Sequence, residues 1–177
     1  MLPAGYEIRA LSQADVPALA AAYRRNRDHL APWEPTRDEA FYTGDGQAAG
    51  VEATLEAAAA GTQDAWLIMQ AAVVVGRITL SNIVRGIFQS ASIGYWTDVA
   101  HTGRGLATEA VGFAVRRADE LGLHRVEAGT LAHNVGSQRV LLKCGFERVG
   151  LARHYLFIAG QWQDHEIYQR VLHDRPA

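Results

Sequence analysis

A run of small residues stands where an apolar strand pattern changes into a helical one. Thr102-Gly103-Arg104-Gly105-Leu106-Ala107 is followed by apolar residues at every third or fourth position. Small side chains at a helix start let a ligand approach the backbone, where the first N–H groups have no partner within the helix. Such a helix start binds anions, phosphates above all. The run therefore predicts a phosphate-binding loop, although the glycines alone would equally suit a tight turn.

Two common phosphate-binding loops do not fit this spacing. A Walker loop needs Gly-Lys followed by Ser or Thr, and no such lysine follows Gly105. A dinucleotide-binding fingerprint needs a third glycine where Thr108 stands, within a βαβ unit at the start of a parallel sheet. The strands before this run instead have the pattern of an antiparallel meander, so both alternatives are poor fits.

A second run, Asn134-x-x-Ser137 followed by Lys143-Cys144-Gly145-Phe146, also begins a short helical pattern. Asn134 is a good N-cap residue, and the serine alone would be an ordinary residue of the first turn. The two runs are separated by one helix and one predicted strand. Neighbouring parallel strands present helix N-termini at the same edge of a sheet, where ligands bind in open α/β arrangements.

Together these runs resemble the acetyl-CoA site of the GNAT N-acetyltransferases. The first is similar to the pyrophosphate loop Gln/Arg-x-x-Gly-x-Gly/Ala, and the second to the motif Asn-x-x-Ser with a terminal Gly-Phe. Ile93-Gly94-Tyr95-Trp96 and Thr108-Glu109-Ala110 resemble the RimJ/RimL branch, which acetylates protein N-termini. Thr102 departs from the usual Gln or Arg, so that side-chain contact to the cofactor does not carry over, whereas the backbone cradle does not depend on it.

The resemblance implies acetyl-CoA as cosubstrate. In the family, the asparagine of the second motif holds the pantetheine arm and the serine hydroxyl approaches the thioester sulfur. These positions are Asn134 and Ser137 here. The full set of cofactor-binding residues expected is Trp96, Thr97, Thr102, Gly103, Arg104, Gly105, Ala107, Thr108, Asn134, Ser137 and Lys143.

Direct attack of an amine on the thioester needs an oxyanion donor, help for the departing thiolate and a base. A backbone N–H at the strand end around Trp96 can hold the oxyanion, and Ser137 can donate a hydrogen bond to the sulfur. The position of His154 matches a proton-accepting group of RimL-type proteins, and an unperturbed imidazole titrates near ~6.5. We therefore expect Trp96, Ser137 and His154 to be catalytic, with an exposed strand residue as the alternative for His154.

The acceptor amine is expected to meet Trp33 and Glu34, because His29 to Pro35 resembles the acceptor-side segment of RimJ/RimL proteins. His154 and Asp164 are further candidates for substrate binding, together with His165. A core plug under a long loop remains an alternative for Trp33, and a solvated hairpin remains one for the others. The seven histidines show neither HxH nor HExxH spacing, so we expect no metal.

The elements that must position these residues follow from the periodicity of the apolar residues. Strands are expected at residues 6–11, 65–70, 73–80, 91–98, 125–131, 147–159 and 161–172, and helices follow Ser12, begin at Val51, follow Gly105 and follow Asn134. Residues 26–50 are expected to form a long loop with one helical piece. A strand–helix–strand crossover predicts one parallel pair in a mostly antiparallel sheet. The fold class is α+β, a central sheet flanked by helices, which is the GNAT fold.

Composition bounds the remaining possibilities. The chain has 177 residues, 49% of them hydrophobic, which suits one domain over residues 1–177. A net charge of −2 without basic runs argues against a general nucleic-acid or membrane surface. The single cysteine, Cys144, excludes an intrachain disulfide and fits a reducing compartment. The N-terminal residues lack a signal-peptide pattern, so a cytoplasmic protein is expected. It is expected to be a monomer or homodimer.

We expect acetyl transfer to the N-terminal α-amine of a protein, by direct attack in a ternary complex. One alternative keeps the cofactor site and changes the acceptor to a small amine such as an antibiotic or polyamine. Another is a catalytically silent acyl-CoA-binding module. A covalent route through Cys144 is disfavoured, because nothing near it in the sequence resembles an activating base.

Overall fold

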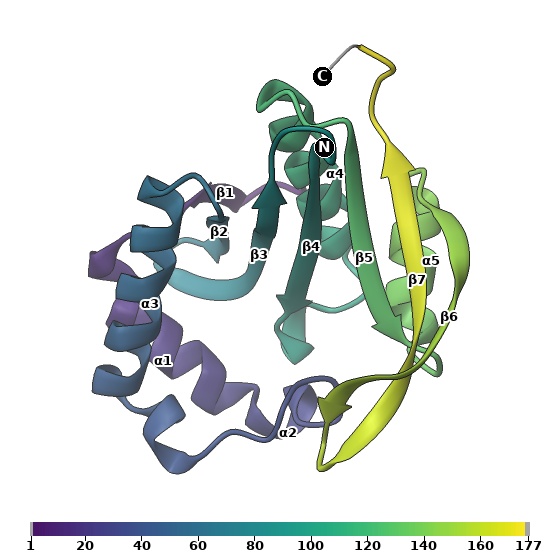
Figure 1. The fold of residues 1–177 in the computed structure, drawn as a ribbon. Coiled ribbons are helices and arrows are strands. Elements are labelled where there is room, and N and C mark those ends of the chain that lie inside the picture. Colours follow the sequence, from purple (N-terminus) through teal and green to yellow (C-terminus); the bar gives the residue numbers. More distant parts are fainter. Residues whose placement is uncertain (1, 176–177) are drawn as a thin grey trace.

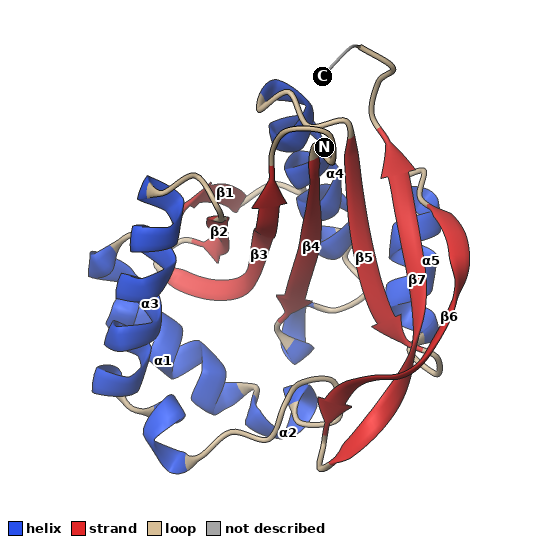
Figure 2. Cartoon of the chain, in the orientation of Figure 1, coloured by secondary structure: helices blue, strands red, loops and turns tan. Residues whose placement is uncertain are grey.

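A computed structural model describes residues 2–175, which fold into one seven-stranded sheet covered by helices on both faces (Figures 1 and 2). The strands are β1 Tyr6–Ala10, β2 Asp64–Gln70, β3 Val73–Val84, β4 Ser90–Thr97, β5 Arg125–Leu131, β6 Glu147–Ile158 and β7 Gln161–Val171. The helices are α1 Val16–Arg25, α2 Arg27–Leu30, α3 Gly44–Ala59, α4 Leu106–Glu120 and α5 Val135–Lys143.

The sheet has the order β1-β2-β3-β4-β5-β7-β6. All neighbours are antiparallel except β4 and β5, which run parallel as the strand–helix–strand crossover predicts. The expected meander β2-β3-β4 and the closing hairpin β6-β7 are both confirmed.

Two apolar layers hold the helices to the sheet. Alternation along β2 sends Trp66 and Ile68 to the layer under α4, and Leu67 and Met69 to the layer under α1. Because β2 faces helices on both sides, it has a nearly continuous run of buried residues rather than a clean polar–apolar alternation. The sheet is thereby fixed between its two helical layers.

The segment after α1 differs from the expected long loop. Helix α3 begins at Gly44 rather than Val51, since the Thr43 side chain accepts a hydrogen bond from the Gly46 N–H and caps the first turn. Gly46 also packs against the carbonyl of Ala40, where a Cβ would lie 2.0 Å from the oxygen. The glycines interpreted as loop residues therefore lie within the start of a helix.

Strands β4 and β5 separate toward their carboxyl ends (Figure 1). Strand β4 pairs with β3 as far as Thr97, but its parallel pairing with β5 runs only from Ser90 to Ser92. The remaining residues of β4 thus have one edge without a ladder partner among the described strands. This edge positions the candidate site.

Candidate active site

The carboxyl end of β4 and the starts of α4 and α5 surround a cavity of about 490 Å³, here called the main cavity. Twelve of the fifteen residues predicted for the site line it. They are Trp33, Glu34, Trp96, Thr97, Thr102, Gly103, Gly105, Ala107, Thr108, Asn134, Ser137 and Lys143. The β4-α4-β5 crossover brings together the residues of β4, α4 and α5, and the loop after α2 adds Trp33 and Glu34.

The open edge of β4 supplies backbone donors to this cavity. The Asp98 N–H donates to the Val75 carbonyl, and antiparallel pairing alternates along the strand. The N–H groups of Tyr95 and Thr97 consequently point away from β3, toward the side that β5 leaves open. Such fixed dipoles can stabilise negative charge on a carbonyl oxygen.

Helix α4 begins in the manner of an anion site. Its N-cap residue is Gly105, with a φ of 79° and no side-chain capping bond, and Gly103 has a φ of 74°. A Cβ at either glycine would meet nothing within 4 Å, so the approach to this backbone is open. Lys143 and Arg139 line the same cavity and add positive charge. The arrangement suits a phosphate group.

The predicted contact of Arg104 with the cofactor is not supported by its position. Its guanidinium donates to the Tyr6 hydroxyl at 3.1 Å and to the Ala100 carbonyl at 3.2 Å, and it is absent from the cavity lining. Arg104 therefore joins the start of α4 to β1 outside the main cavity.

Asn134 and Ser137 combine a structural role with a place in the cavity. The Asn134 side chain accepts a hydrogen bond of 3.0 Å from the Ser137 N–H, which caps α5. The Ser137 hydroxyl lies 2.8 Å from the hydroxyl of Tyr95, and either oxygen can be the donor. Burial raises the pKa of Tyr95 to about 12, so this phenol keeps its proton at neutral pH. Two adjacent hydroxyls thus face the cavity.

Tyr95 was missed by the sequence analysis as a side chain. Trp96, the residue chosen instead, sends its indole to the opposite face of the sheet, where its N–H donates to the Tyr23 hydroxyl at 3.1 Å. Strand alternation could have found this, because adjacent residues of a strand cannot both face the cofactor side. The same alternation turns the Trp96 N–H toward β3, so the donors on the open edge are the N–H groups of Tyr95 and Thr97 and the catalytic expectation for Trp96 loses its support.

The residues expected to contact the acceptor, Trp33 and Glu34, lie in the loop that follows α2 and line the main cavity. Trp33 lies against the His133 ring, with centroids 5.5 Å apart, and keeps 37% of its surface exposed. Glu34 is half-buried, and burial raises its pKa against the opposing influence of Arg37 and Arg77. His29 and His101, which were not predicted as site residues, also line the cavity.

His154 and Asp164 do not line the main cavity, contrary to expectation. His154 has a φ of 49° in a bulge of β6, where its N–H donates to the Asp164 carboxylate at 2.9 Å. His165 is buried in β7 opposite Leu131. A base at His154 and a substrate contact at Asp164 therefore lose their geometric support, because a bulge places the pair on the outer hairpin.

Cys144 is buried, and burial raises the pKa of its thiol. The thiol lies 3.3 Å from the carbonyl oxygen of Thr108, to which it donates. A protonated, hydrogen-bonded thiol is a poor nucleophile, which agrees with the expectation of direct attack.

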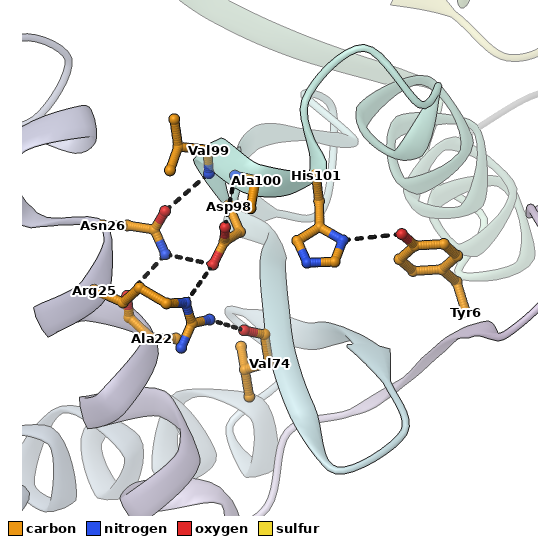
Figure 3. A network of polar contacts seen from close by, with 9 residues as sticks. All are labelled: Tyr6, Ala22, Arg25, Asn26, Val74, Asp98, Val99, Ala100 and His101. Carbon is orange, nitrogen blue, oxygen red and sulfur yellow. Dashed lines mark hydrogen bonds and ion pairs between the residues drawn. The ribbon is translucent and has the colours of Figure 1, made fainter.

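A buried polar network fixes the end of β4 to α1 (Figure 3). The Asp98 carboxylate accepts hydrogen bonds from Arg25 at 2.7 Å, Asn26 at 2.8 Å and the Ala100 N–H at 2.9 Å. The Asn26 side-chain oxygen accepts from the Val99 N–H. His101, in the same turn, bonds the Tyr6 hydroxyl at 2.9 Å. The turn leading into the phosphate loop is therefore held from both sides.

Neither a metal-binding cluster nor a membrane-spanning helix occurs in the described part of the chain. Within residues 2–175 no cluster of three or more His, Cys, Asp or Glu side chains could hold a metal ion. None of the helices described over that range is long and apolar enough to cross a membrane.

Comparison with known proteins gives a consistent result. A sequence model of the family described as "Acetyltransferase (GNAT) domain" matches residues 6–147. The chain is 37% identical over 163 residues to the probable N-acetyltransferase YjcK of Bacillus subtilis (strain 168). The aligned residues cover 90% of each protein.

Two solved structures share both the fold and part of the sequence. The ribosomal-protein-S5-alanine acetyltransferase from Vibrio fischeri has a TM-score of 0.94 at 30% identity, covering 99% of this chain and 98% of that one. Mycobacterium smegmatis RimJ in complex with CoA-disulfide has a TM-score of 0.89 at 29% identity, covering 94% of this chain and 81% of that one. The expected fold class is thereby confirmed.

Proposed function

The chain belongs to the GNAT acetyltransferase family and is an acetyl-CoA-dependent N-acetyltransferase, and from that premise we propose that its acceptor is the N-terminal α-amine of a protein. One observation carries the proposal. The open edge of β4, the start of α4 and the Tyr95–Ser137 hydroxyl pair meet in a single cavity that also reaches Trp33 and Glu34.

Each part of this cavity meets one need of acetyl transfer. The start of α4, with Lys143 nearby, would hold the pyrophosphate of acetyl-CoA, and Asn134 would lie along its arm. The N–H groups at the end of β4 would polarise the acetyl carbonyl. Either Ser137 or Tyr95 would donate a hydrogen bond to the departing sulfur, because both hydroxyls keep their protons at neutral pH.

The choice of an α-amine rests on the similar structure from Vibrio fischeri, named for acetylating the alanine of a ribosomal protein, and on acid–base arithmetic. A free α-amine has a reference pKa of ~7.7 to 8.0, against ~10.4 for lysine, so at pH 7 roughly a tenth of the former but less than a thousandth of the latter is neutral. An α-amine therefore needs little help from a base.

The test compares two peptides as acceptors for the purified protein with acetyl-CoA. One has a free N-terminal alanine or serine and no lysine, and the other is N-acetylated with one internal lysine. We expect the first to release CoA thiol at least about a hundredfold faster, in line with the difference in neutral amine. A preference for the blocked, lysine-bearing peptide would contradict the α-amine assignment, and a preference for small amines over both peptides would replace it.

A further inference from the structure

Glu34 occupies the wall shared by two cavities. A second cavity of about 280 Å³ lies between α1, α2, the loop after α2 and the tip of the β6-β7 hairpin, and Leu30 and Glu34 line both it and the main cavity. Among residues 2–175, the Glu34 carboxylate has no hydrogen-bond or ion-pair partner. The positive charges of Arg37 and Arg77 act on it only from a greater distance. Partial burial of a carboxylate without such a partner costs free energy. That cost suggests a functional role for Glu34.

The backbone around Glu34 is fixed. Its carbonyl accepts a hydrogen bond from the Ala159 N–H at the hairpin tip, at 3.4 Å, and the Trp33 N–H donates to the Leu30 carbonyl at 2.8 Å. Pro35 follows and disfavours a helical conformation at Glu34. The carboxylate is therefore presented at the junction by an anchored segment.

Burial and the nearby positive charges act in opposite directions on the Glu34 carboxylate. Burial raises its pKa, and Arg37 and Arg77 oppose that shift. Tyr23, beside it, has a pKa raised by burial and stays uncharged. The other titratable or charged side chains lining the two cavities are Arg27, Asp28, His29, Tyr42, Tyr95, His101, Arg139 and Lys143.

We propose that the acceptor amine enters through the second cavity and that Glu34, at its junction with the main cavity, is the general base that removes the first proton from the acceptor ammonium. This inference rests on the proposed acetyl transfer and adds the route of the acceptor and the identity of the base. Of the other candidates for the base, His101 is hydrogen-bonded to the Tyr6 hydroxyl. His29 lines the main cavity but not the second cavity.

Glu34 takes one proton from the ammonium, and the nitrogen lone pair forms a C–N bond to the acetyl carbon while the carbonyl electrons move to oxygen. Collapse of this intermediate restores the carbonyl and breaks the C–S bond. The second nitrogen proton leaves with the sulfur as CoA thiol, by way of the Ser137 and Tyr95 hydroxyls, and Glu34 releases its proton to water.

The experiment measures kcat and KM of Glu34→Gln between pH 6 and 9, with acetyl-CoA and whichever amine the parent protein acetylates. Because about a tenth of an α-amine is already neutral at pH 7, loss of a general base is expected to lower kcat by about tenfold near neutral pH, with KM for acetyl-CoA unchanged. Below the pKa of the amine, the variant should lose activity about tenfold per pH unit, since only the neutral amine reacts. The deficit should therefore shrink as pH rises.

Glu52→Gln is the matched control, because Glu52 is an exposed carboxylate of α3 outside both cavities, and it should behave as the parent. Circular dichroism and thermal unfolding establish that each variant is folded. If Glu34→Gln raises KM for the amine but keeps kcat, Glu34 only binds the ammonium and the proposal is wrong. If His29→Asn abolishes the rate and Glu34→Gln does not, the base is His29.

The two proposals fail in different ways. A parent that acetylates only small amines overturns the α-amine acceptor, while a large kcat deficit of Glu34→Gln with those amines still identifies the base. A parent that releases no CoA thiol with any amine overturns both.

Discussion

At the scale of single residues, the Tyr95 and Ser137 hydroxyls are both proposed donors to the leaving sulfur. The oxygens lie 2.8 Å apart, and the partly buried phenol stays protonated. When one of the two hydrogen-bonded hydroxyls gives its proton to the sulfur, the other hydroxyl can replace that proton. The pair should therefore act as a unit.

We predict that Ser137→Ala and Tyr95→Phe each lower kcat by about tenfold or more, with little change in the KM for acetyl-CoA, because the hydrogen bond strengthens only as charge develops on sulfur. The double variant should lose little more than the worse single variant, since residues acting as a unit are not additive. Steady-state kinetics of the three variants measures this.

Tyr155→Phe removes a half-exposed phenol of β6 outside the cavity and should leave kcat unchanged. Full additivity of the two losses would show that the hydroxyls act independently. Parental turnover in Ser137→Ala would reduce that residue to part of a helix start.

At the scale of elements, the start of α4 offers its backbone through two left-handed glycines. Gly105→Val should abolish CoA binding, because a branched side chain would occupy the open side of the backbone donors. The left-handed φ also costs roughly 1–2 kcal/mol for a residue with a Cβ. Calorimetric titration with CoA and thermal unfolding separate the two effects.

Gly86→Val is the matched control. Gly86 also has a positive φ, 72°, with open space around it, but it lies in the β3-β4 turn outside the cavity. It should lose similar stability and keep its affinity for CoA. Unchanged affinity in a folded Gly105→Val protein would disprove the phosphate-loop assignment.

Much of this architecture could be predicted because its signals are local. Apolar periodicity located α4 and β5, and the Asn134 cap located α5. The start of α3 could not be predicted, since Gly46 is required there by contact with Ala40 rather than by a loop conformation. The bulge that turns His154 outward was equally hidden, because it depends on a hydrogen bond to Asp164 in the facing strand.

At the scale of the whole molecule, the Asp98 network joins the end of α1 to the turn between β4 and α4 (Figure 3). Burial disfavours the charge on Asp98, but hydrogen bonds from Asn26, Ala100 and Arg25 together outweigh it and lower the pKa of this carboxyl. The same holds for Asp15, whose pKa is lowered to about 2 chiefly by its hydrogen bonds with Arg9.

These shifts predict the acid stability of the protein. A carboxyl whose pKa is lower in the folded state stabilises the fold above its unfolded pKa, and this contribution is lost as pH falls through the folded value. The free energy of unfolding should therefore decline below about pH 4. Asp98→Asn should cost about 2 kcal/mol at pH 7, as expected for a buried, charged hydrogen-bond acceptor, and should decline less steeply in acid.

Denaturant unfolding at several pH values measures both effects. Asp119→Asn is the control, because Asp119 forms a half-exposed ion pair with Arg175 that contributes little to stability. Equal stability of the parent and Asp98→Asn at pH 7 would show that the network does not stabilise the packing of α1 against the end of β4.

The separation of β4 from β5 also bears on aggregation. A free strand edge is a template on which another chain can add a strand. The outer strand β6 interrupts its edge with two bulges, whereas the open edge of β4 is regular but lies inside the main cavity, beside the starts of α4 and α5. The open edge of β4 therefore lies inside a cavity, unlike the outer edges of β1 and β6 at the two sides of the sheet.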